Sequence, residues 1–461
     1  MEKKVKTIYA SLAKKYSKEA LEFLKEACSI NSIYDEKTIA PEKPFGEGVD
    51  KALKYIADLG VKLGFKAERC DGYASELTYG EGPLIDIYAH MDVVPVSPNW
   101  LSDPFTPRIE NDVMYARGSA DDKGPGIAAL YGAKLCLDQG WIKGYKVRVI
   151  FGGNEERGSL CLDHYFHKMH KPYPTYGFSP DADYPLIFAE KGIYTYKVDF
   201  DLDDQRIPSF KYGQATNVVL DEAYLPLKDS SLFVKPLADY QKNHPEIMAE
   251  ILNSSLHFKG KASHGSVPWN GVNAGLHLLN FLGEVFNIKV LKEIFLDYQY
   301  GDGKNFDGDY KSAYFDSSSY CVGVMSYDGK TLSLLVNMRL PENVEADKAV
   351  EHVEKVTHPS CIELLGGSPS LVKDPSSPFI QALLKAYQEE TGDYQTKPLA
   401  IGGGTYARET ENTVAFGMQF PGVDCLMHQD NEFLRLKDFY QSIGIYAHAI
   451  QALGELAKEH K

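Results

Sequence analysis

Histidine and carboxylate side chains that could bind metal ions or move protons recur in five short segments of the chain. The first segment contains His90 and Asp92 at the end of an apolar run. Side chains alternate along a strand, so His90 and Asp92 point to the same face. A metal-binding imidazole commonly donates its second N–H group to a carboxylate, and Asp92 is placed to accept it. Taken alone, this pair still favours a purely structural hydrogen bond.

Adjacent carboxylates occur in the next two segments. Asp121 and Asp122 lie in a glycine-bounded turn, where they repel each other unless a cation or hydrogen-bond donors neutralise them. A helix-capping turn explains this pair equally well. Glu155 and Glu156 follow an apolar strand that ends at Phe151, so one could bind a metal while the other transfers a proton. A surface pair of glutamates is the simpler explanation of the second pair.

The last two segments bring further ligand types. Asp181 and Asp183 lie in a turn after a strand-like stretch, and His428 lies far downstream. All five segments follow predicted strands of one α/β pattern, and such folds place their sites at the carboxyl ends of the strands. Two histidines with three or more carboxylates and no cysteine favour a pair of zinc or manganese ions that share a bridging carboxylate.

Alternating helical and strand patterns predict the elements that position these residues. Helical spacing recurs near residues 49–63, and apolar runs near 84–89 and 145–151 are typical of buried strands. This alternation predicts a mostly parallel sheet flanked by helices. From 192 to 374 the strands alternate apolar and polar residues, which predicts an antiparallel sheet in an α+β region. A long helix near 377–390 and a C-terminal helix return to the first pattern.

Composition and charge exclude several classes of protein. The chain has 461 residues, of which 44% are hydrophobic and 25% charged, so a disordered or fibrous chain is excluded. Its net charge of −15 repels phosphate groups, and we expect no nucleic acid or membrane partner. No apolar run approaches the roughly 18 residues of a membrane span. Seven cysteines without a CxxC pair fit a reducing compartment, which predicts a cytoplasmic protein.

Taken together, the motifs resemble the dinuclear-zinc amidohydrolase family of carnosinases, succinyl-diaminopimelate desuccinylases and glutamate carboxypeptidases. Within this family the chain is most similar to the bacterial dipeptidase V branch, also called Xaa-His dipeptidase. The resemblance runs along essentially the whole chain, and chance does not produce so many motifs in one order. The motifs are PFGEG at 44–48, AHMDVVP at 89–95, RGSADDKGP at 117–125, NEE at 154–156, DHYF at 163–166, FSPD at 178–181, KASHGSVP at 261–268, GGGTY at 402–406 and MHQ at 427–429.

The resemblance implies an α/β fold in which one domain is inserted into another. Residues 1–191 and 375–461 would form a discontinuous catalytic domain that binds the metals on its mostly parallel sheet. Residues 192–374 would form an inserted α+β lid domain with an antiparallel sheet. A length of 461 residues at about 150 residues per domain allows two or three domains, and the order of the motifs indicates two.

The resemblance also implies two divalent metal ions per chain, expected to be zinc, with manganese as the alternative. The implied ligands are His90 and Asp181 for one ion, Glu156 and His428 for the other, and Asp121 as the bridge between them. A cis peptide bond would follow the bridging residue. The spacing leaves Asp183 as the fallback for Asp181.

Catalytic and substrate-binding roles follow from the same resemblance. Glu155 would act as general base and acid, taking a proton from the metal-bridging water and passing it to the leaving amine. Asp92 would orient His90. His264 in the inserted domain would donate a hydrogen bond to the tetrahedral oxyanion.

Three further residues would contact substrate. Arg339 would bind the terminal carboxylate with its two-pronged guanidinium, and Asn217 would assist it. Without the resemblance, an arginine in a strand indicates an exposed, salt-bridged residue. Gly403 lies in a triple-glycine stretch that would let the backbone approach substrate closely.

The expected function is metal-dependent hydrolysis of dipeptides that have a free N-terminus, through a metal-bridging hydroxide. Its partners would be small peptide substrates, and we expect the monomer to be active because the inserted region is long for a lid that serves only dimerisation. One alternative is an N-acyl-amino-acid deacylase or desuccinylase of the same architecture. The other is a metal-stabilised binding protein without turnover.

Overall fold

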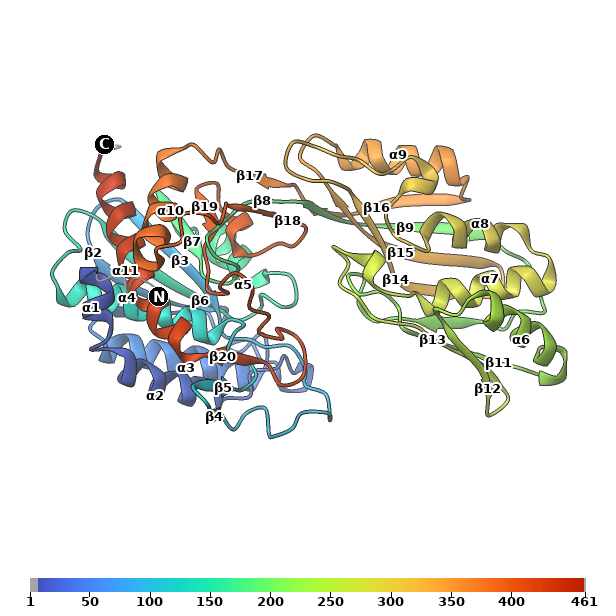
Figure 1. Ribbon diagram of the computed structural model, residues 1–461, viewed down its shortest axis with the longest axis horizontal. Helices are drawn as coiled ribbons and strands as arrows, with labels where there is room; N and C mark the ends of the chain where they lie inside the picture. Colours follow the sequence, from blue (N-terminus) through green and yellow to red (C-terminus); the bar gives the residue numbers. More distant parts are fainter. Residues whose placement is uncertain (1–6, 460–461) are drawn as a thin grey trace. The chain divides into compact units, whose positions relative to one another are not determined.

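Two compact units make up the computed structural model, which describes residues 7–459 (Figure 1). The first unit comprises the chain up to Phe188, the segment Lys373–Leu399 and the chain from Thr405 onward. The second unit comprises Ala189–Val372 and Ala400–Gly404. The first unit is therefore assembled from segments that lie on both sides of the second unit in the sequence.

A large mixed sheet, most of whose strands belong to the first unit, forms the centre of that unit. Its strands, in spatial order, are β1 (Lys66–Cys70), β2 (Ala74–Gly80), β6 (Lys146–Gly152), β3 (Leu84–His90), β7 (Tyr176–Ser179), β19 (Thr413–Ala415), β8 (Ile187–Glu190) and β17 (Leu371–Val372), with β18 (Leu399–Ile401) also paired to β8. The central pairs β6–β3, β3–β7 and β7–β19 are parallel. The pairs nearer both edges are antiparallel.

The parallel strands bring the candidate site residues to one edge of the sheet. β3 and β6 are connected through α4 (Lys123–Asp138), and their register pairs His90 with Gly152. β7 runs parallel to β3 on its other side and ends at Ser179. The loops that follow these three strands therefore start side by side, as expected at the carboxyl ends of parallel strands.

Small residues let α4 lie unusually close to the sheet. A side chain at Gly126 would place a Cβ atom 2.8 Å from Ala89 Cβ and from Phe151 Cε1. The same helix also packs against α11 (Leu436–Glu459), where a Cβ atom at Gly132 would lie 2.8 Å from Tyr446 Cβ. Because α4 is covered on both sides, its alanines and glycines are buried.

Shorter elements complete the first unit. A separate three-stranded antiparallel sheet is formed by β20 (Phe433–Arg435), β5 (Val113–Tyr115) and β4 (Arg108–Glu110). The helices are α1 (Ile8–Ala13), α2 (Ser17–Cys28), η1 (Glu36–Thr38), α3 (Glu47–Lys62), α5 (Leu160–Asp163), the π-helix η2 (His164–Lys168), α10 (Pro378–Thr391) and η6 (Tyr406–Glu409). α3 packs on β1 and β2, and its helical spacing matches the prediction for residues 49–63.

The second unit is an α+β fold with antiparallel sheets, as the alternating strand pattern predicted. Its larger sheet has the order β10 (Phe210–Tyr212), β14 (Ser319–Tyr327), β15 (Thr331–Leu340), β9 (Gly192–Asp201) and β16 (Cys361–Ser368). Its smaller sheet has the order β11 (Glu222–Pro226), β13 (Ser255–Lys259) and β12 (Met248–Leu252). The helices are η3 (Ser230–Leu232), α6 (Val234–Asn243), η4 (Pro268–Asn270), α7 (Ala274–Phe286), α8 (Lys289–Tyr298), η5 (Lys304–Phe306) and α9 (Ala346–Thr357). One buried hydrophobic cluster joins the four α-helices among them to the sheets.

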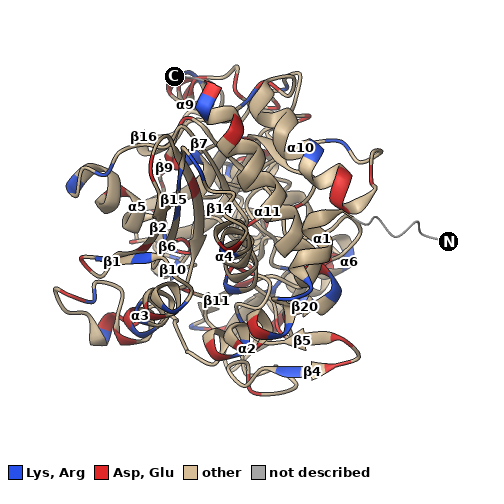
Figure 2. Ribbon diagram, turned by 90° about the vertical axis from the view of Figure 1, so that its left-hand side faces the viewer, with Lys and Arg blue, Asp and Glu red and all other residues tan. Residues whose placement is uncertain are grey.

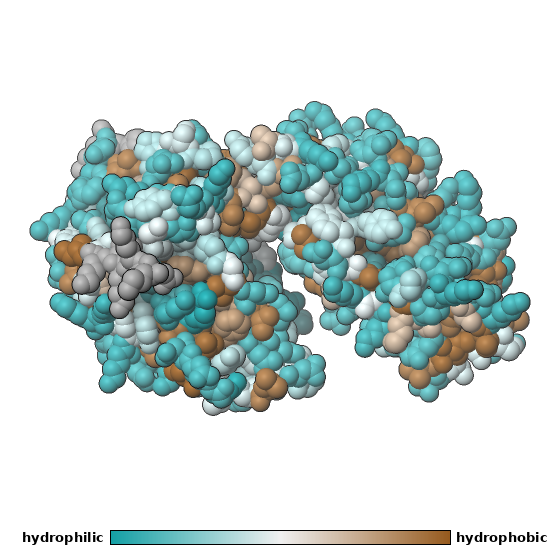
Figure 3. All heavy atoms as spheres, viewed as in Figure 1, coloured by the Kyte–Doolittle hydropathy of each residue, from teal (hydrophilic) through white to brown (hydrophobic). Residues whose placement is uncertain are grey.

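Charged residues of both signs are interspersed along the ribbon, and the face seen in Figure 3 is largely hydrophilic (Figures 2 and 3). Across residues 7–459, no helix is both long enough and apolar enough to cross a membrane. All seven cysteines are free thiols, and six of them are buried.

Candidate metal centre

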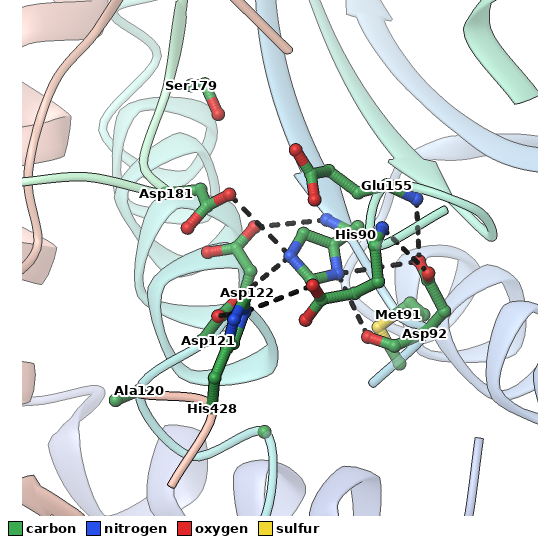
Figure 4. Close-up of polar contacts among 12 residues, drawn as sticks. His90, Met91, Asp92, Ala120, Asp121, Asp122, Glu155, Ser179, Asp181 and His428 are labelled. Carbon is green, nitrogen blue, oxygen red and sulfur yellow. Dashed lines mark hydrogen bonds and ion pairs between the residues drawn. The ribbon is translucent and has the colours of Figure 1, made fainter. Parts of the chain in front are cut away.

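His90, the last residue of β3, lies at the centre of the site and is completely buried (Figure 4). Its Nδ1 is 2.9 Å from the backbone carbonyl oxygen of Asp92, and a carbonyl only accepts hydrogen bonds. Nδ1 therefore carries the proton, and Nε2 faces the acidic residues. Nε2 lies 2.9 Å from Asp121 Oδ1 and 3.7 Å from Asp181 Oδ2.

Asp121 lies between two imidazoles. Its Oδ1 faces His90, whereas its Oδ2 is 2.8 Å from Nε2 of His428. The same His428 nitrogen lies 3.1 Å from Glu156 Oε2. The peptide bond between Asp121 and Asp122 is cis, as the resemblance implied. One carboxylate thus joins the His90 side of the site to the His428 side.

Asp92 has a wider role than the sequence indicated. Its Oδ1 is 3.5 Å from His90 Nδ1, close to the imidazole that it was expected to orient. The same carboxylate also accepts hydrogen bonds from the backbone N–H groups of Glu155 and Glu156, at 3.1 and 3.2 Å. Asp92 therefore holds the loop after β6 next to the end of β3.

The structure distinguishes Asp181 from Asp183 by their contacts. Asp181 follows β7 and faces His90. Asp183 instead accepts a hydrogen bond of 2.7 Å from Nε2 of Gln419, with which it also forms a β-bridge. Only Asp181 belongs to a group of potential ligand atoms, shared with His90 and Glu155, that lie within 4.8 Å of one another.

Burial and negative charge dominate the electrostatics of the site. Burial raises the pKa of Glu155 well above its usual range, and the charges of Asp181 and Glu156 add to this effect although His90 opposes it. Burial and Asp121 raise the pKa of Glu156 to about 7. Burial lowers the pKa of His428, but its contacts with Asp121 and Glu156 outweigh this and raise it to about 11. The pocket thus strongly favours positive charge, whether as protons or as divalent cations.

The donor set fits divalent transition metals. Among the described residues, His90, Asp121 and Glu156 form one group whose potential ligand atoms lie within 4.8 Å of one another, and His90, Glu155 and Asp181 form another. Imidazole nitrogens and carboxylate oxygens without thiolates are typical ligands of zinc and manganese. Bound cations would also relieve the repulsion among the buried carboxylates.

Glu432 supports the site but was not singled out by sequence reasoning. Its buried carboxylate accepts hydrogen bonds from the backbone N–H groups of Gly118, Ala120 and Asp121, at 3.1, 2.8 and 3.2 Å. It also pairs with Arg117 at 2.8 Å. In the sequence, the only feature that pointed to Glu432 was its position at the end of the segment that contains His428. Glu432 shapes the turn that presents Asp121.

Asp122 contributes through the backbone. Its Oδ2 accepts a hydrogen bond of 3.0 Å from the backbone N–H group of His90. Burial raises the pKa of Asp122 well above its usual range. The adjacent aspartates therefore have different tasks, because Asp121 faces the imidazoles and Asp122 anchors the end of β3.

The predicted residues of the inserted domain lie in the second unit. Residues flanking His264 and Asn217 pair there, since Val218 forms a β-bridge with His264 and the Gly265 N–H group donates to the Asn217 carbonyl. His264 Nδ1 is 2.7 Å from Ser266 Oγ. Asn217 and His264 are both exposed.

Arg339 is buried in β15, in contrast to the exposed position that a strand arginine would ordinarily occupy. Its Nε donates to Asn337 Oδ1 at 2.9 Å, and its Nη1 donates to the Gly402 carbonyl at 2.7 Å. Gly403 follows in the same glycine stretch of the second unit. These hydrogen bonds fix the direction of the guanidinium group.

Comparison with known proteins places this site in a family. The model of Peptidase family M20/M25/M40 matches residues 87–452, which include every predicted site residue. The chain belongs to this peptidase family. A Staphylococcus haemolyticus protein named "putative dipeptidase" is 34% identical over 464 residues, covering 95% of this chain and 97% of that protein. The predicted family and the prediction of a hydrolase that acts on peptide bonds are confirmed.

Solved structures of the family share the fold. Human carnosine dipeptidase 1 superimposes with a TM-score of 0.59 at 14% identity, covering 97% of this chain and 98% of the human chain. An M20 family metallo-carboxypeptidase of Sulfolobus solfataricus gives a TM-score of 0.58 at 20% identity, covering 95% and 99%. The predicted combination of a parallel-rich α/β sheet and separate antiparallel sheets is therefore confirmed as the family's fold.

Proposed function

We propose that this M20 peptidase is a metal-dependent dipeptidase that hydrolyses dipeptides with a free amino terminus. The observation that carries the proposal is the position of Asp121, whose two oxygens face His90 and His428 at 2.9 and 2.8 Å. A carboxylate between two imidazoles matches the ligand set of a two-metal site. The relative named as a dipeptidase, which aligns along nearly the whole chain, supports the choice of dipeptides.

Five residues would hold the metals. The proposed ligands are His90 and Asp181 for one ion, His428 and Glu156 for the other, and Asp121 for both. Zinc is the expected metal, with manganese as the alternative. When bound, the cations supply Lewis-acid polarisation of the scissile carbonyl and acidify water.

Glu155 is the proposed proton carrier. Its neighbour Glu156 contacts His428, whereas the potential ligand oxygen of Glu155 lies within 4.8 Å of those of His90 and Asp181. Asp92 accepts hydrogen bonds from the backbone N–H groups of both glutamates, so Glu155 is held beside the proposed ligands. From there its carboxylate takes a proton from the attacking water and delivers it to the leaving amine.

Residues of the second unit recognise substrate in this proposal. Arg339 binds the terminal carboxylate, since its guanidinium is already directed by Asn337 and the Gly402 carbonyl. Asn217 assists Arg339, and His264 donates a hydrogen bond to the oxyanion. Gly403 lets the substrate lie close to the backbone. The sequence resemblance supports these four roles.

A substrate panel tests the proposal. Purified protein is assayed with free dipeptides, their N-acetylated forms and N-acyl amino acids, before and after removal of metal with a chelator. We expect hydrolysis of the free dipeptides, its loss on chelation, and its return with added zinc or manganese. Preference for N-acyl amino acids would identify a deacylase instead. The absence of any chelator-sensitive hydrolysis would favour a binding protein without turnover.

A further inference from the structure

A second group of metal-ligating side chains lies within the second unit, in residues that no proposed role uses. His244 follows the end of α6, Glu246 lies two residues later, and His277 lies in the first turn of α7. Glu246 Oε1 is 3.1 Å from His244 Nδ1 and 3.7 Å from His277 Nε2. All three potential ligand atoms lie within 4.8 Å of one another. We call these three residues the His244 cluster.

The buried member of the cluster is held in one orientation. His277 is 5% exposed, and the hydroxyl of Tyr240 lies 3.0 Å from its Nδ1. The same hydroxyl donates to the backbone carbonyl of His277 at 3.1 Å and accepts a hydrogen bond from Asn280 Nδ2 at 3.2 Å. In the arrangement in which the hydroxyl proton goes to the carbonyl, Nδ1 of His277 donates to the hydroxyl oxygen. This partner is the kind of outer contact that orients metal-binding histidines.

The orientation of His277 has a consequence for its other nitrogen. With the proton on Nδ1, Nε2 presents a lone pair to the Glu246 carboxylate. A lone pair opposite a carboxylate is repelled unless a cation lies between them. An ion pair between His244 and Glu246 would explain their contact at 3.1 Å, but it leaves the direction of His277 unexplained.

The other two members lie on a segment that the fold holds in place. The His244 ring stacks on Tyr240 with centroids 4.2 Å apart. Gln241 Nε2 donates to the carbonyl oxygens of His244 and Ile247, at 3.1 and 2.5 Å. Gln241 Oε1 in turn accepts from the N–H group of Ala249. The turn that carries His244 and Glu246 is therefore fixed next to α7 before any ion binds.

We propose that His244, Glu246 and His277 form a further divalent metal site that takes zinc or a similar transition metal. Two imidazoles and one carboxylate are a recurrent zinc ligand set. The Glu246 side chain is 45% exposed, so water can complete the coordination. The ion ties the end of α6 to α7 and stabilises the second unit by binding only its folded form. The site does not depend on the proposed dipeptidase activity.

Metal stoichiometry tests the site. Full-length wild type, Glu246→Gln and the control Glu284→Gln are equilibrated by dialysis with the same free zinc concentrations, and zinc per chain is measured. Glu284 is an exposed glutamate on α7 outside the His244 cluster. We expect Glu246→Gln to bind one zinc ion fewer than wild type, whereas Glu284→Gln binds as many as wild type. Equal zinc content in wild type and Glu246→Gln overturns the proposal.

A measurement on the wild-type protein removes any dependence on the folding of variants. Diethyl pyrocarbonate modifies accessible imidazole groups, and mass spectrometry of peptides reports each histidine separately. We expect zinc to slow the modification of His244 several-fold and to leave the exposed His358 unchanged. Unchanged modification of His244 under saturating zinc contradicts the site. Hydrolysis by Glu246→Gln should equal that of wild type, which separates this site from the His90 centre.

Discussion

At the scale of single residues, the site consists of buried side chains whose charged forms would be unstable without oppositely charged partners. Burial raises the pKa of Glu155, Asp181 and Asp122, because a carboxylate loses its hydration inside the protein. The two imidazoles at His90 and His428 compensate part of this charge. The remainder is what divalent cations would neutralise. The carboxylates have different proposed roles, and these roles lead to two predictions.

Replacement of Glu155 by Gln should reduce kcat by a factor of about 10²–10⁴, because the amide cannot carry the proton. The metal content of the Glu155→Gln variant should stay near that of wild type, since Glu155 is not a proposed ligand. Glu156→Gln is the matched comparison and should lose metal, because it removes the charge that faces His428 at 3.1 Å. Steady-state kinetics and metal analysis distinguish the two variants. A Glu155→Gln variant that keeps more than about a tenth of wild-type kcat would contradict the role.

Glu432 should act as a positioning residue for Asp121. Glu432→Gln removes the charge that pairs with Arg117 and leaves only one side-chain oxygen for three backbone N–H groups. We expect metal affinity to fall about 10–100-fold, as is usual for outer contacts, with activity recovering at high metal concentration. Asp424→Asn, an exposed substitution four residues before His428, is the control and should bind metal as wild type does. Equal metal affinity of Glu432→Gln and wild type would rule out the positioning role.

At the scale of elements, strand ends deliver the chemistry and helices hold the strands in register. β3, β6 and β7 end side by side, so the end of β3 and the loops after β6 and β7 bring His90, Glu155 and Asp181 together. The small residues of α4 allow close packing behind β3 and β6. The second unit also carries a partly buried carboxyl group on α8, and its effect on stability can be tested.

Asp297 on α8 should make stability depend on pH. Burial, and to a lesser extent Glu293, raise the pKa of Asp297 from 3.8 to about 6. Between about pH 4 and 6 the folded chain therefore binds more protons than the unfolded chain, so the free energy of unfolding falls as pH rises. The difference corresponds to about 3 kcal/mol, which partial exposure reduces to about 1–2 kcal/mol.

The variant Asp297→Asn should remove this pH-dependent loss in the free energy of unfolding. We expect its free energy of unfolding to exceed that of wild type by about 1–2 kcal/mol at pH 7.5 and to match wild type near pH 4. Urea unfolding at the two pH values measures the difference. The control Asp239→Asn, at an exposed position on α6, should change the free energy of unfolding by the same small amount at both pH values. A gain for Asp297→Asn that does not depend on pH would contradict the explanation.

At the scale of the whole molecule, the chain divides its proposed tasks between two units. The proposed metal ligands lie in the first unit, and His264, Asn217 and Arg339 lie in the second. Part of the net charge of −15 consists of carboxylates in the candidate metal centre, which two divalent cations would offset by four charges. In the proposed mechanism hydrolysis uses residues of both units, and we expect one chain to supply them all.

Mixing of two inactive variants should show that one chain suffices. His264→Ala lacks the proposed oxyanion donor, and His428→Ala lacks a proposed metal ligand. We expect the mixture to remain as inactive as its components at every protein concentration, because each chain supplies His264 to its own site. Sedimentation of the wild type measured alongside should show an active monomer. Activity that reappears on mixing and rises with concentration would mean that His264 acts across a dimer.

By itself the sequence predicted which residues could take part in the chemistry and which elements carry them. Apolar periodicity predicted strands 84–89 and 145–151 and the change to alternating strands after residue 192, because periodicity follows from which face each element buries. The resemblance added the family, which comparison then confirmed.

Only the tertiary structure decided contacts between distant parts of the chain. Asp181 and Asp183 are equivalent in sequence, but the chain brings Gln419 to Asp183 and leaves Asp181 facing His90. Glu432 reaches Arg117 across 315 positions, a contact for which no local pattern exists. The His244 cluster likewise joins α7 to a turn about thirty residues earlier. Local sequence specifies helices and strands through residue propensity and hydrophobic period. The partners of a residue in the site depend instead on which distant segments of the chain the fold brings next to it.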